Sequence, residues 1–215
     1  MSLSIQDAKG LIAEVKEREI ALGRAPETWY TYENHVYGVA NVARTIASKI
    51  KGMDEEQAYV NALLHDICKT EENRVQRFHG ILGYEKLIDK DEKAARSAIV
   101  HMFPWNKIPS FENCSQMFFG NKKDYDFVSA YLNEHEATDS DFLIQLSDTL
   151  ANKNGIVTIE QRAEEYVQRN GLDLTSSLVQ EMLAPRFELK EYFDKKIGGD
   201  VYKLFTKVPT VSRER

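Results

Sequence analysis

Cysteine is scarce in this sequence, where only Cys68 and Cys114 occur among 215 residues. Two widely separated cysteines form neither a disulfide framework nor the paired spacing of a zinc finger, which favours a reducing compartment. The chain also lacks an apolar run of about 18 residues and the pattern of a signal peptide. We therefore expect a cytoplasmic protein that has no membrane as a partner.

Proline and glycine are also few, at 5 and 11 residues, and this scarcity favours helices over many short strands. The net charge of −6 argues against nucleic acid as a partner, although local basic groups can still form a pocket for a small polyanion. A hydrophobic content of 42% is sufficient for one substantial core. We predict a single all-α domain over residues 1–215, with its core at about 30–155 and a helical extension over 156–215.

The tetrapeptide Leu64-His65-Asp66-Ile67 places two polar side chains in an apolar run. It falls in a predicted helix over about residues 55–68 that is apolar on nearly all sides. Burying either polar group without a partner costs several kcal/mol. A buried hydrogen bond between His65 and Asp66 is one explanation, but adjacent helical side chains point about 100° apart. A shared metal ion, which takes nitrogen and carboxylate ligands, explains the pair better.

Two other predicted helices carry a polar side chain on an apolar face. His35 falls at helical spacing with Val39, and Asp148 shares a face with Ile144 in a helix expected to end at Asn154-Gly155. Taken alone, His35 is better explained as a core histidine bonded to a carbonyl. Together with His65 and Asp66, the two residues make a set of two nitrogens and two carboxylates, which suits Mn, Fe, Co, Ni or Zn.

The order His35, His65-Asp66 and Asp148, with the context Ala-Leu-Leu-His-Asp-Ile-Cys-Lys, resembles the HD-domain superfamily of metal-dependent phosphohydrolases over about residues 30–155. This resemblance implies an all-α fold with a core of about five helices around a metal site. It also implies that these four residues bind a divalent transition metal.

Two further histidines extend the resemblance. Several HD subfamilies have two histidines between the His-Asp pair and the final aspartate, and they bind two metals. His79, at a predicted helix start, and His101, at a predicted helix end, fall where that pattern places them. The resemblance thus implies one or two ions, with Asp66 bridging a pair. Met102 departs from the pattern of relatives with a second histidine there, and His101 alone could also be an imidazolium that caps its helix.

The chemistry that this resemblance implies is hydrolysis by a metal-activated water, whose pKa falls from 15.7 towards about 7. Asp66 and Lys69 are the expected catalytic residues. Lys69 follows His65 by one helical turn and can offset negative charge on a phosphate, although a surface lysine is an alternative. The candidate substrate-binding residues are Lys69, Arg77, Lys107 and Trp105.

We therefore expect an enzyme, a phosphohydrolase for a nucleotide or a related small phosphorylated substrate. The same ligands would serve an HD-type di-iron oxygenase, and a non-catalytic metal- or nucleotide-binding module is a third reading. The aromatic-rich segment 104–123 has little regular pattern and is expected to be either a lid or a structural flap.

Overall fold

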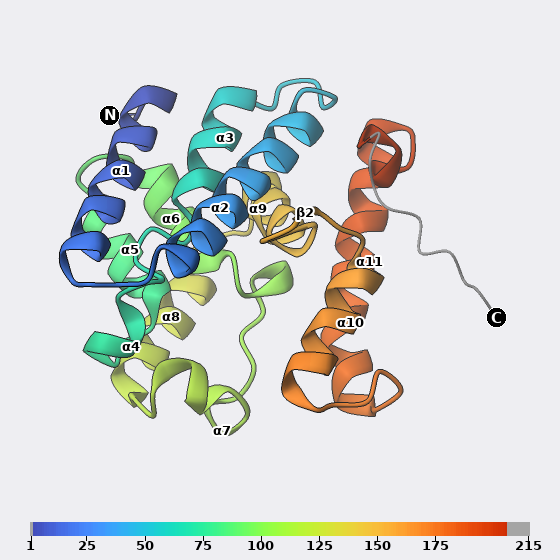
Figure 1. The fold of residues 1–215 in the computed structure, drawn as a ribbon. Helices are drawn as coiled ribbons and strands as arrows, with labels where there is room; N and C mark the ends of the chain where they lie inside the picture. Colours follow the sequence, from blue (N-terminus) through green and yellow to red (C-terminus); the bar gives the residue numbers. More distant parts are fainter. Residues whose placement is uncertain (1, 206–215) are drawn as a thin grey trace.

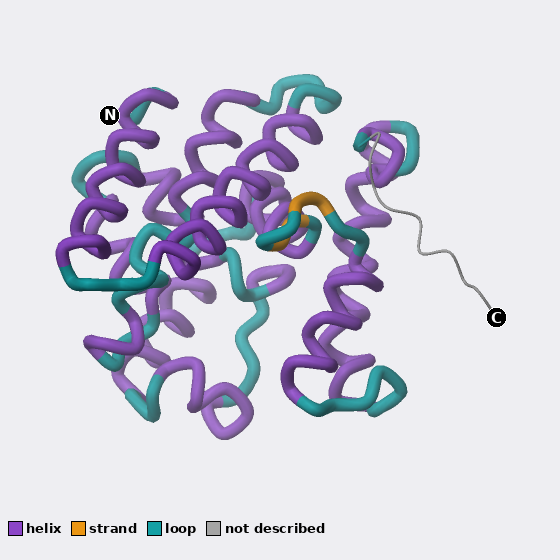
Figure 2. The backbone as a smooth tube through the Cα atoms, viewed as in Figure 1, coloured by secondary structure: helices purple, strands orange, loops and turns teal. Residues whose placement is uncertain are grey.

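The computed structural model describes residues 2–205 and is helical almost throughout (Figures 1 and 2), which confirms the predicted all-α class. No helix within these residues combines the length and apolar character needed to cross a bilayer. The elements of this part of the chain follow in the order α1 (Ile5–Ala21), α2 (Pro26–Ala47), α3 (Glu55–Leu64), α4 (Glu72–Val75), α5 (His79–Leu87), α6 (Glu92–Val100), η1 (Pro104–Asn106), α7 (Phe111–Cys114), η2 (Ser115–Phe118), α8 (Lys122–Glu134), α9 (Asp139–Thr149), β1 (Ala151–Asn152), β2 (Gly155–Ile156), α10 (Ile159–Asn170), α11 (Ser177–Ile197) and η3 (Val201–Leu204).

Helices α2, α3, α5, α6 and α9 pack around a shared apolar core. Helix α2 lies against α3 and α9, α3 also contacts α6 and α9, and α5 lies against α6. Figure 1 shows α1, α2 and α3 side by side, in blue to cyan. Val39, Ile46, Leu63, Ala98 and Ile144 are fully buried where these helices meet. The arrangement matches the core of about five helices that the sequence implied.

The α-helix that was predicted over about 55–68 ends earlier, at Leu64. The carbonyl of Ala62, which in a longer helix would accept from the backbone of Asp66, accepts instead from Nδ1 of His65 at 2.6 Å. The chain continues in tighter turns, in which the N–H of Lys69 donates to the carbonyl of Asp66 at 2.8 Å. This change of winding lets the adjacent His65 and Asp66 face the same space.

The prediction of a helix that continues to Asn154 was wrong. Helix α9 ends at Thr149, and the next residues form a two-stranded antiparallel hairpin in which Asn152 lies opposite Gly155. Gly155 has a φ of 121°, a conformation that favours glycine, and Asn-Gly is a common hairpin signal. The hairpin reverses the chain and leads into α10.

Helices α10 and α11 form a pair beside the bundle, orange to red in Figure 1. The predicted capping box is present, because the Thr158 hydroxyl accepts from the N–H of Gln161 at 3.2 Å. Helix α11 passes through Pro185 and packs against α9 and η1. The extension predicted over 156–215 is therefore helical up to η3, and its last residues, 206–215, lie outside the described part.

The segment 104–123 contains short helical turns and packs as a structural flap. Phe118 is fully buried against Phe78, with ring centroids 5.0 Å apart, and Phe103 belongs to the same apolar cluster. None of the described residues 104–123 lines the pocket that holds the metal-site residues. The aromatic side chains therefore stabilise the fold, and the alternative of a lid over the site is not supported.

Candidate metal centre

The carboxylate of Asp66 lies at the centre of a group of buried or half-buried histidines and aspartates that come from different helices. His35 comes from α2, His65 and Asp66 from the turn after α3, and His79 from the start of α5. His101 comes from the end of α6, and Asp148 from α9. These are the six residues predicted as ligands, His35, His65, Asp66, His79, His101 and Asp148. The structure brings all of them together although they span more than a hundred positions of sequence.

One group of ligand atoms faces Oδ2 of Asp66. Nε2 of His35 lies 3.7 Å and Nε2 of His65 lies 3.6 Å from this oxygen. Oδ1 of Asp148 lies 3.2 Å from Nε2 of His35 and 3.8 Å from Nε2 of His65. Metal bonds to these atom types are about 2.0–2.2 Å long, so atoms with this spacing can share one ion.

A second group faces Oδ1 of the same carboxylate. Nε2 of His79 lies 3.0 Å and Nε2 of His101 lies 3.3 Å from this oxygen. The two Nε2 atoms are 3.2 Å from each other, and the three ligand atoms lie within 4.8 Å of one another. Asp66 thus faces both groups, one with each oxygen.

Hydrogen bonds from the other ring nitrogen to backbone carbonyls orient two of the buried histidines. Nδ1 of His65 lies 2.6 Å from the carbonyl of Ala62, and Nδ1 of His101 lies 2.9 Å from the carbonyl of Ala98. Both carbonyls lie three residues earlier, at the end of a helix, and a carbonyl can only accept. Nδ1 therefore carries the proton, and the lone pair of Nε2 points into the site, as in metal-binding histidines.

Two of the buried polar side-chain atoms that lack a hydrogen-bond partner among the described residues lie in this centre and fit a bound cation. Nε2 of His65 and Oδ1 of Asp66 are buried with no well-oriented hydrogen bond in the described structure. Leaving such an atom unsatisfied costs about 1–3 kcal/mol. A divalent ion in the first group would accept the lone pair of His65, and one in the second group would accept that of Asp66 Oδ1, so the nitrogen and carboxylate donors fit one or two transition metal ions.

The charges of the centre also favour metal ligation. Complete burial lowers the pKa of His65 to about 4, which keeps its ring neutral at physiological pH. Burial opposes ionisation of Asp66, but the electrostatic influence of the His65 and His79 rings and the contacts with His101 and His79 outweigh it and hold the Asp66 pKa well below its usual range. Burial likewise opposes ionisation of Asp148, and the hydrogen bond from His35 lowers the Asp148 pKa in spite of it. Two anionic carboxylates are therefore available to a cation.

Glu72 is a supporting residue that the sequence analysis missed. Its Oε2 lies 2.5 Å from Nδ1 of His79 and its Oε1 lies 2.8 Å from Nζ of Lys69. Glu72 therefore fixes the ring of His79 from behind and holds the Lys69 amine at the edge of the pocket. The spacing of Lys69 and Glu72, three residues apart at a helix start, is a weak signal that could have indicated the pair.

Three residues proposed to bind substrate lie elsewhere. Arg77 points away from the pocket and forms a two-pronged ion pair with Glu85, with both distances 3.0 Å. Trp105 packs edge-on against the ring of Phe142, with centroids 4.6 Å apart, and Lys107 is exposed. Neither these two residues nor Arg77 lines the pocket among the described residues, so the structure does not support these three assignments. Proximity in sequence to the ligands was a poor guide because the chain turns away after each of them.

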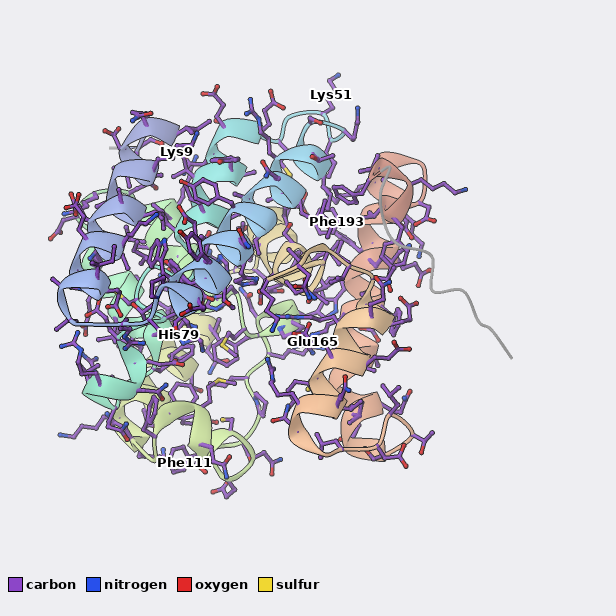
Figure 3. The ribbon with its side chains drawn as sticks, in the orientation of Figure 1. Lys9, Lys51, His79, Phe111, Glu165 and Phe193 are labelled. Carbon is purple, nitrogen blue, oxygen red and sulfur yellow. The ribbon has the colours of Figure 1, made fainter. Side chains whose placement is uncertain are left out.

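The ligands lie in a pocket of about 630 Å³, a size typical of small-ligand sites. Helices α10 and α11 form its opposite wall, and Figure 3 labels His79 in the bundle and Glu165 on α10. Cationic side chains that the sequence analysis did not single out also line it, namely Arg24, Lys153, Arg162, Arg169 and Arg186. Arg162 and Arg169 are seven residues apart and share a helix face, but nothing in the sequence indicated that this face turns to the site.

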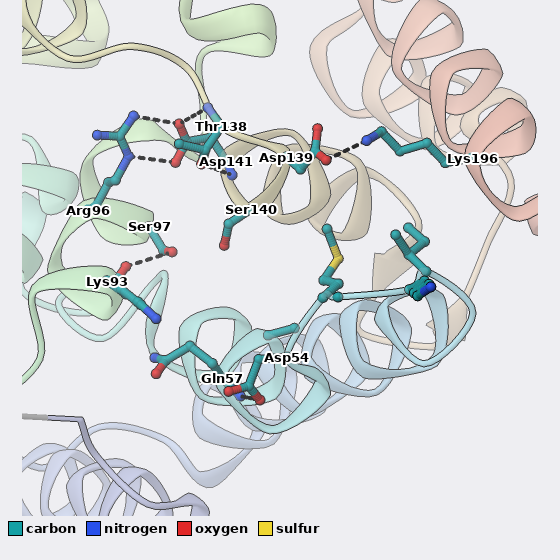
Figure 4. A pocket seen from close by; sticks show the side chains of 15 residues that line it. Asp54, Gln57, Lys93, Arg96, Ser97, Thr138, Asp139, Ser140, Asp141 and Lys196 are labelled. Carbon is teal, nitrogen blue, oxygen red and sulfur yellow. Dashed lines mark hydrogen bonds and ion pairs between the residues drawn. The ribbon is translucent and has the colours of Figure 1, made fainter.

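A second hollow, of about 500 Å³, lies between α3, α6 and α9 and is separate from the ligands (Figure 4). Arg96 binds both carboxylate oxygens of Asp141 there, at 2.8 and 2.7 Å, and Lys196 pairs with Asp139. No buried side-chain polar atom among the described residues that line this hollow lacks a partner. Its charges hold helices together, and nothing in it requires a ligand.

Comparison with known proteins places the converging residues within one family model. The model described as HD domain matches residues 32–153, which is more than half of the 215 residues. The matched range contains all six of the ligand residues. No curated protein and no solved structure matches the chain.

Proposed function

The chain belongs to the HD-domain family, and on that premise we propose that it is a metal-dependent phosphohydrolase. Its substrate would be a nucleotide or a related small phosphorylated molecule, cleaved at a phosphoester or phosphoanhydride bond. One observation carries the proposal, namely that the two oxygens of Asp66 face two separate ligand groups at 3.0–3.7 Å. A carboxylate in that position can hold two cations side by side, as in two-metal hydrolytic sites.

The division of labour follows from the contacts. Bound metal ions would supply Lewis acidity and lower the pKa of the attacking water towards about 7. The water oxygen would form the new bond to phosphorus, and the bond to the leaving oxygen would break with its electron pair while a proton passes to that oxygen or to solvent. Lys69, held by Glu72 at the pocket edge, is placed to offset negative charge on the phosphoryl oxygens.

The test combines metal analysis of the purified protein with a panel of phosphoesters and nucleotides. Asp66→Ala should reduce turnover by at least about 100-fold, beyond the 10- to 100-fold loss typical of residues that only support a ligand. The matched control is Asp126→Ala, which removes an exposed carboxylate on α8 that pairs only with Lys122 in the described structure. Phosphohydrolase activity that survives Asp66→Ala would contradict the whole site assignment.

The same assay separates the two other readings. Activity with Mn²⁺ or Co²⁺ in anaerobic buffer would exclude a di-iron oxygenase, since neither dioxygen nor iron is present. Metal or nucleotide binding with no turnover of any panel member would indicate a non-catalytic module. Two equivalents of metal would favour use of both ligand groups, and one equivalent would favour the group of His35, His65, Asp66 and Asp148.

A further inference from the structure

The pocket continues well past the metal ligands, along the wall formed by α10 and α11. That wall carries Arg162 and Arg169 on α10 and Arg186 on α11, and the turn of the β1–β2 hairpin adds Lys153. Helix α11 packs against α9, the helix that carries Asp148. The space beside these cations is therefore continuous with the reacting centre and can receive a part of the substrate that is not cleaved.

Most of these cations have no carboxylate partner. Within residues 2–205, no carboxylate oxygen lies within 4.0 Å of a charged nitrogen of Lys153, Arg169 or Arg186. Arg162 lies 3.5 Å from Glu165, and that carboxylate also accepts from the side chain of Asn152 at 2.9 Å. Among the described residues that line this wall, there are thus four cationic side chains and one carboxylate, that of Glu165. The surplus of positive charge is available to an anion.

The electrostatic neighbours of two arginines show that the wall begins beside the centre. Burial lowers the pKa of Arg186, and the negative charge of Asp148 acts against that effect. Burial also disfavours the charged form of His35, but the hydrogen bond and charge of Asp148 outweigh it and raise the His35 pKa, and the positive charge of Arg162 acts against that rise. Each arginine is therefore within electrostatic reach of a ligand of the first group.

We propose that the substrate carries two or more linked phosphate groups, and that Arg162, Arg169 and Arg186 bind the phosphates that follow the one being attacked. This inference rests on the proposed function, because it takes the reacting phosphate to lie at the metal ligands. A guanidinium presents its donors in a planar fork that matches two phosphate oxygens. A monoester would leave the arginine wall without a partner, whereas a phosphate chain spans the two regions. The overall charge of −6 disfavours a nucleic acid polymer as the source of these phosphates.

The experiment compares Arg162→Gln, Arg169→Gln and Arg186→Gln with the wild-type chain, all loaded with Mn²⁺. The control is Arg44→Gln, which removes an exposed arginine on α2 that lies over the ring of Tyr59 and outside the pocket. Arg162→Lys keeps the charge but loses the fork. Catalytic efficiency is measured with a nucleoside triphosphate and with p-nitrophenyl phosphate, which has a single phosphate group.

Binding is measured separately, by calorimetric titration of inorganic tripolyphosphate into each protein and into buffer that contains Mn²⁺. The buffer titration corrects for chelation of the metal, and thermal unfolding shows whether each variant is folded. Since Arg169 is exposed, its substitution should leave the fold intact even if Arg186→Gln does not fold.

Hydrogen bonds to charged groups typically change an equilibrium constant by about tenfold or more. The arginine variants should therefore bind tripolyphosphate at least about tenfold more weakly and lose as much kcat/KM with the triphosphate. Their loss of kcat/KM relative to Arg44→Gln should be several-fold smaller with p-nitrophenyl phosphate than with the triphosphate, and Arg162→Lys should recover part of the loss with the triphosphate. Equal losses with both substrates, or unchanged tripolyphosphate binding, would overturn the inference.

The two proposals can fail separately. Arginine-dependent binding of tripolyphosphate without hydrolysis of any phosphoester would refute the hydrolase and leave the phosphate-chain site in place. Hydrolysis of monoesters combined with arginine-independent binding of tripolyphosphate would refute the phosphate-chain site and leave the hydrolase in place.

Discussion

Replacing Gly80 with alanine should damage the second ligand group more than the first. Gly80 follows His79 in α5, where α5 packs closely against α6. A Cβ atom at Gly80 would lie 2.7 Å from the carbonyl oxygen of Ala98 and 2.5 Å from the ring of Phe78. The Ala98 carbonyl is the acceptor that orients His101. The methyl group would therefore push directly on the backbone that sets the position of one ligand, beside another.

The stability cost of this change can be isolated with Gly10→Ala. Gly10 lies in α1, and a Cβ there would meet nothing within 4 Å. Both substitutions reduce the entropy of the unfolded chain, which typically stabilises by about 0.4–1 kcal/mol. Overpacking acts only at Gly80 and typically costs about 1–3 kcal/mol. The free energy of unfolding of Gly80→Ala should therefore be about 1–3 kcal/mol lower than that of Gly10→Ala.

Two measurements check this reasoning. Urea unfolding of the metal-free variants gives the difference in stability, and metal titration gives the stoichiometry and affinity of each group. We expect Gly80→Ala to lose affinity at the group of His79 and His101, with a smaller effect at the group of His35 and His65. If both variants show the same stability and the same metal binding, the close approach of α5 and α6 does not control the position of His101.

The other predictions concern residues outside the ligand set. Glu72→Gln should weaken metal binding at His79 by about 10- to 100-fold, as for other residues that orient a ligand; an unchanged isotherm would remove Glu72 from the site. Arg77→Gln, which breaks the ion pair with Glu85, should leave kcat/KM unchanged, and a loss that depends on substrate would restore Arg77 to the pocket. Burial raises the pKa of Asp91, but its hydrogen bonds, including one from the Leu3 N–H at 2.9 Å, outweigh this and lower it. The stability that the ionised Asp91 side chain adds to the fold is therefore fully present above the pKa of about 3.9 that it has in the unfolded chain. This stability is lost as the pH falls through the lower pKa of the folded state. The stability difference between wild type and Asp91→Asn, from urea unfolding at a series of pH values, should shrink with falling pH, and a constant difference would contradict this.

The sequence specified the ligands because they are polar groups in an apolar periodicity. His35, Asp148 and the His65-Asp66 pair each interrupt a hydrophobic pattern, and a buried polar group needs a partner wherever the helix lies. Helical composition and capping signals such as Thr158 with Gln161 are also local, so the class of fold and several helix starts could be predicted. The resemblance added His79 and His101, which the pattern alone did not join to the site.

The sequence did not determine which cations face the site. Arg77 and Lys107 are near the ligands in sequence and point elsewhere, whereas Arg162 and Arg186 are far away in sequence and line the pocket. That choice depends on a hairpin of two residues per strand after α9, which reverses the chain and lays α10 and α11 across the pocket.

The winding at Asp66 was settled by tertiary structure as well. A local pattern predicts a continuous helix through His65, but the end of α3 depends on whether the Ala62 carbonyl bonds to backbone or to the histidine ring. The His65 ring, and not the backbone N–H of Asp66, bonds to this carbonyl because its other nitrogen faces the Asp66 carboxylate. Helices α2, α5, α6 and α9 bring the other ligands to the same place. The sequence alone thus determined which polar groups lie on apolar helix faces and therefore need a partner when buried. Only the packing of distant helices decided which partners they meet, because residues far apart along the chain can lie close together or far apart in space.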